Sequence, residues 1–415
     1  MTGTPADITS APTLSSRTAL LLAFVSGAAV ANVYYAQPLL DDLGTQLDMS
    51  PAALGWVTTA TQGGYLLGLV LAVPLGDRLD RRRMILVQLA LTAVGLAGAA
   101  VAPTAVIFLA CSAVFGAAST VVQVITAFAA GASPDHRRGR TVGLVTSGVV
   151  VGILLARSVS GLIADLWGWR SVFWVAALIM LALTGWLSRA LPLDAAVKDT
   201  VPYRRSVISV IELTMRDRTF RVRSLIGGLM FASFGAVWGA IALPLAAAPW
   251  RLTAMQIGLF GIIGAAGALG ATRAGRWADS GRAEVATGVM LLTLLASWLA
   301  IAQTPNSLLL LAVGLLALDF AGQAVHVINQ HLIVESDPAA TTRLIGGYMV
   351  YYSIGTGGGA LAATLAYALG GWTQASMVGA GLAAAALTVW AVDGLLRRRS
   401  AAGTFAPRTP RTRRR

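Results

Sequence analysis

The sequence predicts an all-α, polytopic membrane protein with twelve transmembrane helices in two pseudo-symmetric six-helix halves. Three observations predict this fold: a very apolar composition, twelve long apolar runs, and an internal repeat of half the chain length. Of the 415 residues, 56% are hydrophobic and 12% are charged. A soluble domain carries about 25% charged residues, and a chain of this length could not hide so much apolar surface from water. Lipid is therefore the expected solvent.

The apolar runs are long enough to cross a bilayer as helices, because a hydrocarbon core of ~30 Å needs about 20 residues. The first six runs are 18–40, 54–75, 84–101, 105–132, 141–163 and 171–191. The second six are 225–247, 255–271, 285–301, 308–334, 344–369 and 375–396. The first run contains Ala29-Val30-Ala31, which resembles a signal-peptide cleavage site. Eleven further runs follow it, which favours a retained transmembrane helix.

The second six runs repeat landmarks of the first six. Leu54-Gly55 recurs as Ile257-Gly258, Asp77 as Asp279, Ser133 as Ser336, Arg140 as Arg343, and Gly168-Trp169 as Gly371-Trp372. The separations are 203, 202, 203, 203 and 203 residues. Five matches in one register are hard to obtain by chance. An internal repeat in so apolar a chain is typical of two-fold transporters rather than of enzymes.

The basic residues predict the orientation in the membrane. Nearly all of the 31 Lys and Arg residues lie in the loops after even-numbered runs and at the two ends, whereas the opposite loops hold only Arg170 and Arg251. By the positive-inside rule, the even-numbered loops and both termini are cytoplasmic, which predicts the cell (inner or plasma) membrane. The net charge of +13 is then a topology signal, and the expected partners at the cytoplasmic face are anionic lipids, not nucleic acid.

The composition divides the chain into five segments. We expect a disordered N-terminal tail at 1–16, an N-terminal half at 17–192, a cytoplasmic linker at 193–222 with room for a surface helix, a C-terminal half at 223–398 and a basic tail at 399–415. The tails are polar, proline-bearing or arginine-rich, a composition that does not fold alone. A single cysteine, Cys111, excludes an internal disulfide, and we expect a monomer.

The loop after the second run carries an acidic–basic motif, Asp77-Arg78-Leu79-Asp80-Arg81-Arg82. Twelve runs in two halves with such a loop resemble the major facilitator superfamily, over about residues 15–398. The family motif is roughly G-x-L-a-D-R-x-G-R-R. The first copy matches at Asp77, Arg78, Arg81 and Arg82, and has Val73 and Asp80 in place of the two glycines. The copy after the eighth run keeps Gly275 and Asp279 and is one residue shorter.

Two further stretches resemble a bacterial subgroup that is usually placed with the drug–proton antiporter and sugar-efflux branches. They are Asn32-Val33-Tyr34-Tyr35-Ala36-Gln37-Pro38, and Gly152-Ile153-Leu154-Leu155-Ala156-Arg157 followed by Gly168-Trp169-Arg170. The resemblance implies a twelve-helix transporter with a small-molecule substrate, whose identity does not follow from it.

The acidic loops predict a cytoplasmic gate. A carboxylate at Asp77 can face a helix N-terminus, and the neighbouring arginines can reach carboxylates of the other half. Such contacts would hold the cytoplasmic side shut in one state and break in the other. The expected gate residues are Asp77, Arg78, Arg81, Arg82, Arg140, Asp279, Arg282 and Arg343. As an alternative the arginines only fix the topology, a role that the acidic residues do not share.

Two charges lie deep in apolar runs, Arg157 in the fifth and Asp319 in the tenth. Since an ionisable side chain at mid-bilayer costs about 2.5–3.5 kcal/mol, both are functional candidates. In the tenth run, Asp319, Gln323, His326 and Gln330 are spaced 4, 3 and 4 apart. At about 100° per residue they form one polar stripe ~16 Å long. The stripe predicts that this face lines a cavity or packs on another polar helix.

We expect Asp319 or His326 to carry a coupling proton, because a buried aspartate or a histidine can exchange protons near neutral pH. The alternative is a structural Arg157–Asp319 pair or simple hydrogen-bonded packing. His326 lies 203 residues after Gln123, so the two halves place polar groups at equivalent positions. The expected substrate-binding residues are Asn32, Tyr35, Gln123, Arg157, Gln323, His326 and Asn329, with Trp238, Tyr351 and Tyr352 as further candidates.

These features predict a secondary active transporter that moves a small organic molecule across the inner membrane by alternating access. Proton-coupled efflux is the first hypothesis, and uptake or exchange of a sugar, nucleoside or other metabolite is the alternative. A non-transporting membrane sensor on a transporter fold is a third hypothesis. The chain has no G-x4-G-K-[S/T] motif, which argues against ATP-driven transport. An enzyme, a metal site and a cofactor are not expected, because no nucleophile or metal-ligand set accompanies Asp319 and His326.

Overall fold

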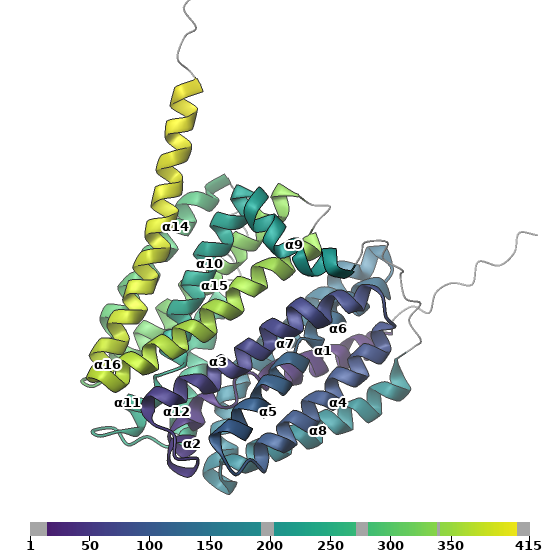
Figure 1. The fold of residues 1–415 in the computed structure, drawn as a ribbon, viewed down its shortest axis with the longest axis vertical. Helices are drawn as coiled ribbons and strands as arrows, with labels where there is room; N and C mark the ends of the chain where they lie inside the picture. Colours follow the sequence, from purple (N-terminus) through teal and green to yellow (C-terminus); the bar gives the residue numbers. More distant parts are fainter. Residues whose placement is uncertain (1–14, 192–202, 271–280, 338–340, 405–415) are drawn as a thin grey trace, which may run out of the picture.

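The computed structural model describes residues 15–191, 203–270, 281–337 and 341–404, and every regular element in these ranges is a helix. This agrees with the all-α prediction. In lipid each segment must satisfy its own backbone hydrogen bonds, which a helix does. The helices of the N-terminal half and those of the C-terminal half form two groups that lie side by side (Figure 1).

The helices of the N-terminal half follow one another through short connections. They are α1 (Ser16–Ala31), α2 (Leu40–Gln46), α3 (Pro51–Leu67), α4 (Arg81–Ala100), α5 (Ala105–Ala118), α6 (Val121–Gly131), α7 (Asp135–Trp167) and α8 (Trp169–Ala190). Helix α3 continues as an irregular helix to Asp77. The side chains of Ser50 and Thr104 accept hydrogen bonds from the first turns of α3 and α5, which fixes where these helices begin.

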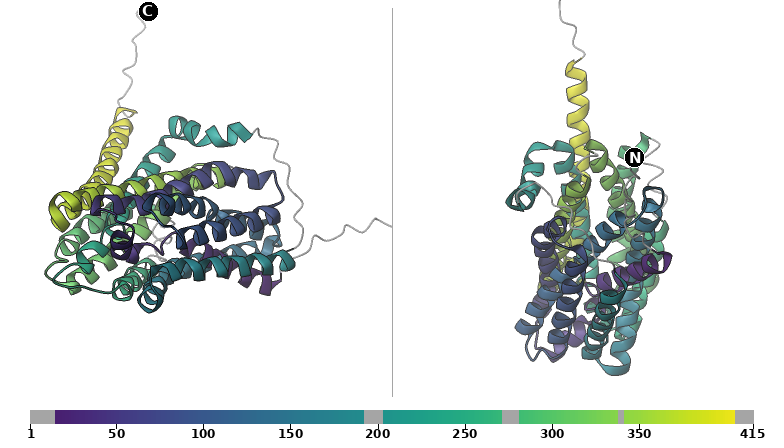
Figure 2. Two further views of the ribbon diagram at one scale, coloured as in Figure 1. Left: turned by 60° about the horizontal axis from the view of Figure 1, so that its bottom comes forward. Right: turned by 90° about the vertical axis from the view of Figure 1, so that its right-hand side faces the viewer.

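The C-terminal half repeats this pattern after the connecting helix α9 (Tyr203–Arg216). Its helices are α10 (Arg218–Trp238), α11 (Ala242–Ala246), α12 (Ala254–Gly270), α14 (Ala283–Ile301), α15 (Leu308–Ser336) and α16 (Thr341–Thr404). Helix α9 contacts the end of α3 as well as α10 and α16, and it lies on the outside of the bundle (Figures 1 and 2). The last part of α16 projects beyond the other helices in each view.

Among the described residues, the long or apolar helices provide twelve crossings. Nine helices are long and apolar enough to cross a membrane, and one of them, α16, breaks at Gly370 and Gly371 into two. The two remaining predicted spans are the shorter apolar helices α1 and α12. The predicted number of transmembrane helices is therefore confirmed.

The repeat found in the sequence is also a repeat of backbone geometry. Gly168 and Gly371 both have positive φ angles, +81° and +69°. Each turns the chain between two successive spans, and each is followed by a buried tryptophan, Trp169 or Trp372. Only glycine adopts this conformation without strain, so the repeated Gly-Trp pairs mark equivalent turns in the two halves.

Two predicted boundaries differ from the structure. Helix α10 begins at Arg218, five residues before the predicted start of the C-terminal half, because the side chain of Asp217 caps its first turn. Helix α16 extends to Thr404, so the first residues of the predicted basic tail continue a helix. No proline interrupts the chain between the last predicted span and Thr404, and nothing therefore ends the helix earlier.

The two halves meet closely at one end of the bundle, which we call the opposite end (the helix ends near Asp48, Gly168 and Gly371). There the hydroxyl of Ser158 on α7 donates to the carbonyl oxygen of Gly258 on α12 at 3.0 Å. A Cβ atom at Gly258 or Gly161 would collide with backbone atoms of the facing helix. Helices α3 and α16 form a second such contact between the halves.

The other end carries the arginine-rich loops, and we call it the arginine-rich end. Here residues 137–140, Gly143, Leu144, Thr146 and Ser147 of α7 are exposed, whereas Val145 is buried, and a Cβ atom at Gly139, Gly143 or Gly346 would meet no atom within 4 Å. Helix α7 thus packs on α12 near the opposite end and separates from the C-terminal half toward the arginine-rich end. The contact between α7 and α12 therefore closes the opposite end, and it does not extend to Gly139 and Gly143 in the first turns of α7.

Candidate functional site

The guanidinium of Arg157 lies buried between the two halves. It stands over two aromatic rings, with its carbon 4.1 Å from the ring centroid of Trp238 and 4.9 Å from that of Tyr34. Its Nε donates to Oε1 of Gln37 at 2.6 Å. Its Nη2 is buried and has no hydrogen-bond partner among the described residues. Cation–π contacts of this kind stabilise a charge that has left water, so the rings replace part of its hydration.

The carboxylate of Asp319 lies at the N–H edge of the same indole. Its Oδ1 accepts a hydrogen bond from Nε1 of Trp238 at 3.3 Å, and the side chain is 6% exposed. No ion pair within 4 Å joins Asp319 to Arg157 among the described contacts, although the two charges are close enough to interact electrostatically. The structure therefore places the two deep charges on one tryptophan, without the direct pair that the structural alternative required.

Glycines of α12 leave room for the side chains of Arg157 and Asp319 to pack against this helix. A Cβ atom at Gly261 would lie 3.0 Å from Cδ of Arg157, and one at Gly264 would collide with the Asp319 carboxylate. Gly267 lies equally close to the backbone of α15. Small residues let membrane helices approach closely. Helix α12 thus presents one glycine face to α7 of the N-terminal half and to α15 of its own half.

The residues of the predicted stripe on α15 occupy one buried side of the helix. Asp319 and Asn329 are buried, and Gln323, His326 and Gln330 are half-buried. Nδ1 of His326 lies 3.1 Å from the hydroxyl of Tyr348, and the ring packs edge-on against Phe231 at 5.1 Å. His326 is thus bonded to α16, and among the described residues no hydrogen bond or ion pair joins it to Asp319.

The other predicted binding residues lie apart from the two charges. The amide of Asn32 donates to the carbonyl oxygen of Ala29 in its own helix at 3.2 Å. Tyr35 is half-buried against the apolar core. Gln123 donates to the hydroxyl of Tyr65 at 3.4 Å. Among the residues of the first span, the structure brings Tyr34 and Gln37 to the charges instead.

Sequence reasoning missed Tyr34 and Gln37 as site residues. They are three positions apart and therefore lie on one face of a helical segment, a spacing that could have found them. The hydroxyls of Tyr34 and Tyr352 are 2.8 Å apart, so this contact also joins the two halves. Trp238, a further candidate in the sequence, lies at the centre of the site.

The predicted gate residues lie at the arginine-rich end. Arg81 donates to the carbonyl oxygen of Gly76 at 3.0 Å, and Arg82 to that of Ser188 at 2.5 Å. Arg78 stands over the ring of Tyr203 at 5.8 Å. Arg140, Arg282 and Arg343 are exposed. The side chain of Asp77 and the whole of Asp279 lie outside the described residues.

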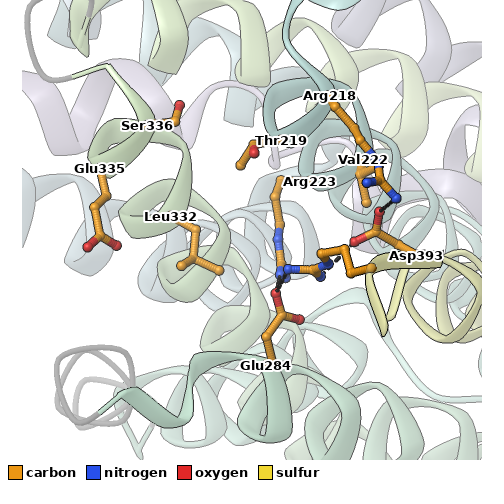
Figure 3. Close-up of a pocket in the computed structure, with 10 residues that line it drawn as sticks. Arg218, Thr219, Val222, Arg223, Glu284, Leu332, Glu335, Ser336 and Asp393 are labelled. Carbon is orange, nitrogen blue, oxygen red and sulfur yellow. Dashed lines mark hydrogen bonds and ion pairs between the residues drawn. The ribbon is translucent and has the colours of Figure 1, made fainter. Parts of the chain in front are cut away.

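A second cluster of charges surrounds a pocket of about 330 Å³ at the arginine-rich end of the C-terminal half (Figure 3). Arg223 pairs with Glu284, and Arg397 pairs with both Glu284 and Asp393. Arg218 pairs with Asp393 at 2.9 Å. These pairs join α10, α14 and α16. Sequence reasoning missed this network because its members come from three helices far apart in the chain.

Comparison with known proteins agrees with this architecture. The sequence profile described as "Major Facilitator Superfamily" matches residues 19–240. The uncharacterized transporter YgaY of Escherichia coli O157:H7 is 42% identical over 91% of this chain and 95% of its own length. A crystal structure of a bacterial homolog of the human lysosomal transporter Spinster, in an inward-facing and occupied conformation, has a TM-score of 0.76 and 14% identity, and covers 91% of this chain and 96% of that one.

The expected all-helical fold and the expected role as a membrane transporter are thereby confirmed. The hypothesis of a non-transporting sensor finds no support. The profile covers more than half of the chain, the relative is similar over nearly its whole length, and the helices have the number and apolar character that the fold requires. The chain belongs to the major facilitator superfamily and is a multi-pass membrane transporter.

Proposed function

We propose that this chain is a proton-coupled secondary active transporter of a small organic molecule, with Arg157, Trp238 and Asp319 as its coupling site. One observation carries the proposal. Two buried charges from different halves contact the same indole and have no direct ion pair. A change in the charge of Asp319 therefore acts on the contact between the halves.

A comparison with the other buried charges supports this assignment. Arg223 and Asp393 are also buried, and each has a direct ionic partner. Asp319 has a neutral indole donor in place of such a partner. Because an uncompensated charge inside a membrane is costly, protonation of this carboxylate changes the relative energies of the states of the transporter. A proton can then shift the conformational equilibrium.

The gating contacts support alternating access. The contacts of α7 with α12 close the opposite end, while residues 137–140 and Gly143 of α7 are exposed at the arginine-rich end. With the predicted orientation this is the inward-facing state. In the outward-facing state the arginine loops would close the cytoplasmic side, with Asp77 and Asp279 as the acidic members of the gate.

Two directions of transport remain in the proposal. Proton-coupled efflux follows from the resemblance to the antiporter branch. Uptake or exchange of a metabolite is the alternative, and the unpartnered nitrogen of Arg157 favours it, for the reason developed below.

The test is transport by purified protein in proteoliposomes with an imposed pH gradient. The substrate is first found by comparing cells that lack the protein with complemented cells on a panel of small organic compounds. With one proton per substrate, a difference of one pH unit supports at most about tenfold accumulation. Asp319→Asn should reduce the ratio to about one and keep exchange without a gradient. Asp41→Asn, at an exposed carboxylate, should leave the ratio unchanged.

Two results would contradict the proposal. The first is a well-folded Asp319→Asn protein with full gradient-driven accumulation. The second is a misfolded Asp319→Asn protein that Arg157→Gln rescues, since this result assigns the two charges to a structural pair. The yield and thermal stability of the detergent-extracted proteins distinguish the second result from a coupling defect.

A further inference from the structure

The guanidinium of Arg157 offers a hydrogen-bond donor that nothing accepts. Gln37 accepts from its Nε, and two aromatic rings cover its faces. Its Nη2 remains without a partner although the residue is only 4% exposed. A buried charged donor without an acceptor is unfavourable, so the site is complementary to an acceptor that is absent in this state.

The nearby carboxylate does not fill this position. Asp319 accepts from the indole of Trp238 and lies against Gly264 of α12. On the other side, Arg157 is held against Gly261 of the same helix. Both side chains pack on α12 and contact the same indole, so in this state Asp319 leaves the donor on Arg157 without an acceptor.

The surroundings of this position are aromatic. Phe234 lies 6.3 Å from Trp238, and Phe231 packs on Tyr352 at 4.3 Å. The tyrosine hydroxyls next to the charge, those of Tyr34 and Tyr352, are bonded to each other. A sugar needs many free donors and acceptors, and one hydroxyl hydrogen of this pair is already used in the bond between the two tyrosines. An apolar or aromatic body suits such walls better.

We infer that the substrate is a small organic anion with an apolar body, whose carboxylate accepts a hydrogen bond from Nη2 of Arg157. The inference rests on the proposed function and specifies its substrate class. An organic cation would be repelled by Arg157, which already occupies the faces of Tyr34 and Trp238. A guanidinium suits a buried carboxylate, because it always stays charged and its charged N–H donors form strong hydrogen bonds.

The charge of the site then links the anion to a proton. Without substrate, Arg157 and a charged Asp319 make the site neutral. A bound carboxylate adds a second negative charge, and two like charges at one site disfavour each other. Asp319 therefore takes up a proton when the anion binds, so that the loaded site is again neutral. Anion and proton move in the same direction, which under an inward proton gradient is uptake.

The experiment uses probes that differ only in charge. Benzoate, benzamide and benzylamine form one series, and octanoate, octanamide and octylamine form another. Binding to the purified full-length protein is measured as an increase in its thermal unfolding temperature. We expect at least one carboxylate to bind at least tenfold more tightly than its amide and amine. Arg157→Gln should remove this preference, and Arg189→Gln, at an exposed arginine of α8, should retain it.

A pH indicator in weakly buffered solution measures the linked proton. The wild type should take up about one proton per bound carboxylate, and Asp319→Asn none. Tighter binding of amides or amines, no binding of any carboxylate, or binding without proton uptake overturns the inference. These measurements on the wild type remain decisive even if a variant does not fold.

Transport separates this inference from the proposed function. Gradient-driven transport of amines but not of carboxylates would overturn the substrate class and leave proton coupling standing. Carboxylates that bind with a proton but never accumulate under a gradient would overturn the proposed function and leave the binding site standing.

Discussion

The contact between α7 and α12 predicts how one methyl group shifts the transporter between its states. A Cβ atom at Gly258 would lie 2.9 Å from the carbonyl carbon of Arg157 and 3.0 Å from Cα of Ser158. These are backbone atoms, so no side-chain rotation relieves the contact. Overpacking of this kind costs about 1–3 kcal/mol. Because the contact joins the two halves, Gly258→Ala destabilises only the state in which the opposite end is closed.

The expected shift follows from this energy. A change of about 1–3 kcal/mol moves an equilibrium between two states by about 5–150-fold. The reporter is Thr364→Cys on a cysteine-free background, because Thr364 is fully buried and lies against Gly55 at the second contact between the halves. Labelling of the purified protein with a maleimide should accelerate by this factor in Gly258→Ala.

Two controls exclude simpler explanations. Gly185→Ala on α8 introduces a methyl group where no atom lies within 4 Å, and labelling should stay at the wild-type rate. A cysteine at Ser112, which is fully buried inside the N-terminal half, should remain unreactive in Gly258→Ala, since the fold is intact. Unchanged labelling of Thr364→Cys in a stable Gly258→Ala protein would refute the assignment of this contact to one state.

Three further predictions concern the topology, the gate and the charge network. In cells, a single cysteine at Asp48 should react from outside and one at Arg138 only after permeabilisation; the opposite pattern would reverse the predicted orientation. Asp77→Asn should slow transport without abolishing substrate binding, which parallel transport and binding assays measure, and a normal transport rate would contradict the gate. Glu284→Gln leaves the buried Arg223 without this ionic partner and should lower the free energy of unfolding by about 2 kcal/mol. This is less than the loss of a fully buried pair would cost, because Glu284 is half exposed. Glu335→Gln, at an exposed carboxylate of the same pocket, should leave the thermal unfolding temperature unchanged.

The sequence by itself determined the number of crossings and the two-fold repeat. Apolar runs of about 20 residues have few alternatives in lipid, because a helix satisfies every backbone group within one segment. The Gly-Trp pairs at Gly168 and Gly371 mark equivalent turns in the structure, as the repeat predicted. A positive φ angle is a local property of the chain that glycine adopts without strain. The two deep charges were also recognisable, because a charge inside an apolar run is rare and costly and its position can be read from the sequence alone.

Only the tertiary structure decided which groups meet these charges. Helical periodicity assigns a residue to a face, but it does not identify the helix that packs there. Arg157 and Asp319 contact one indole instead of each other, and His326, on the same stripe as Asp319, bonds to Tyr348. These contacts depend on how closely the glycines of α12 let α7 and α15 approach. Such distances arise from the packing of helices far apart in the chain, and a single sequence contains no local signal for them.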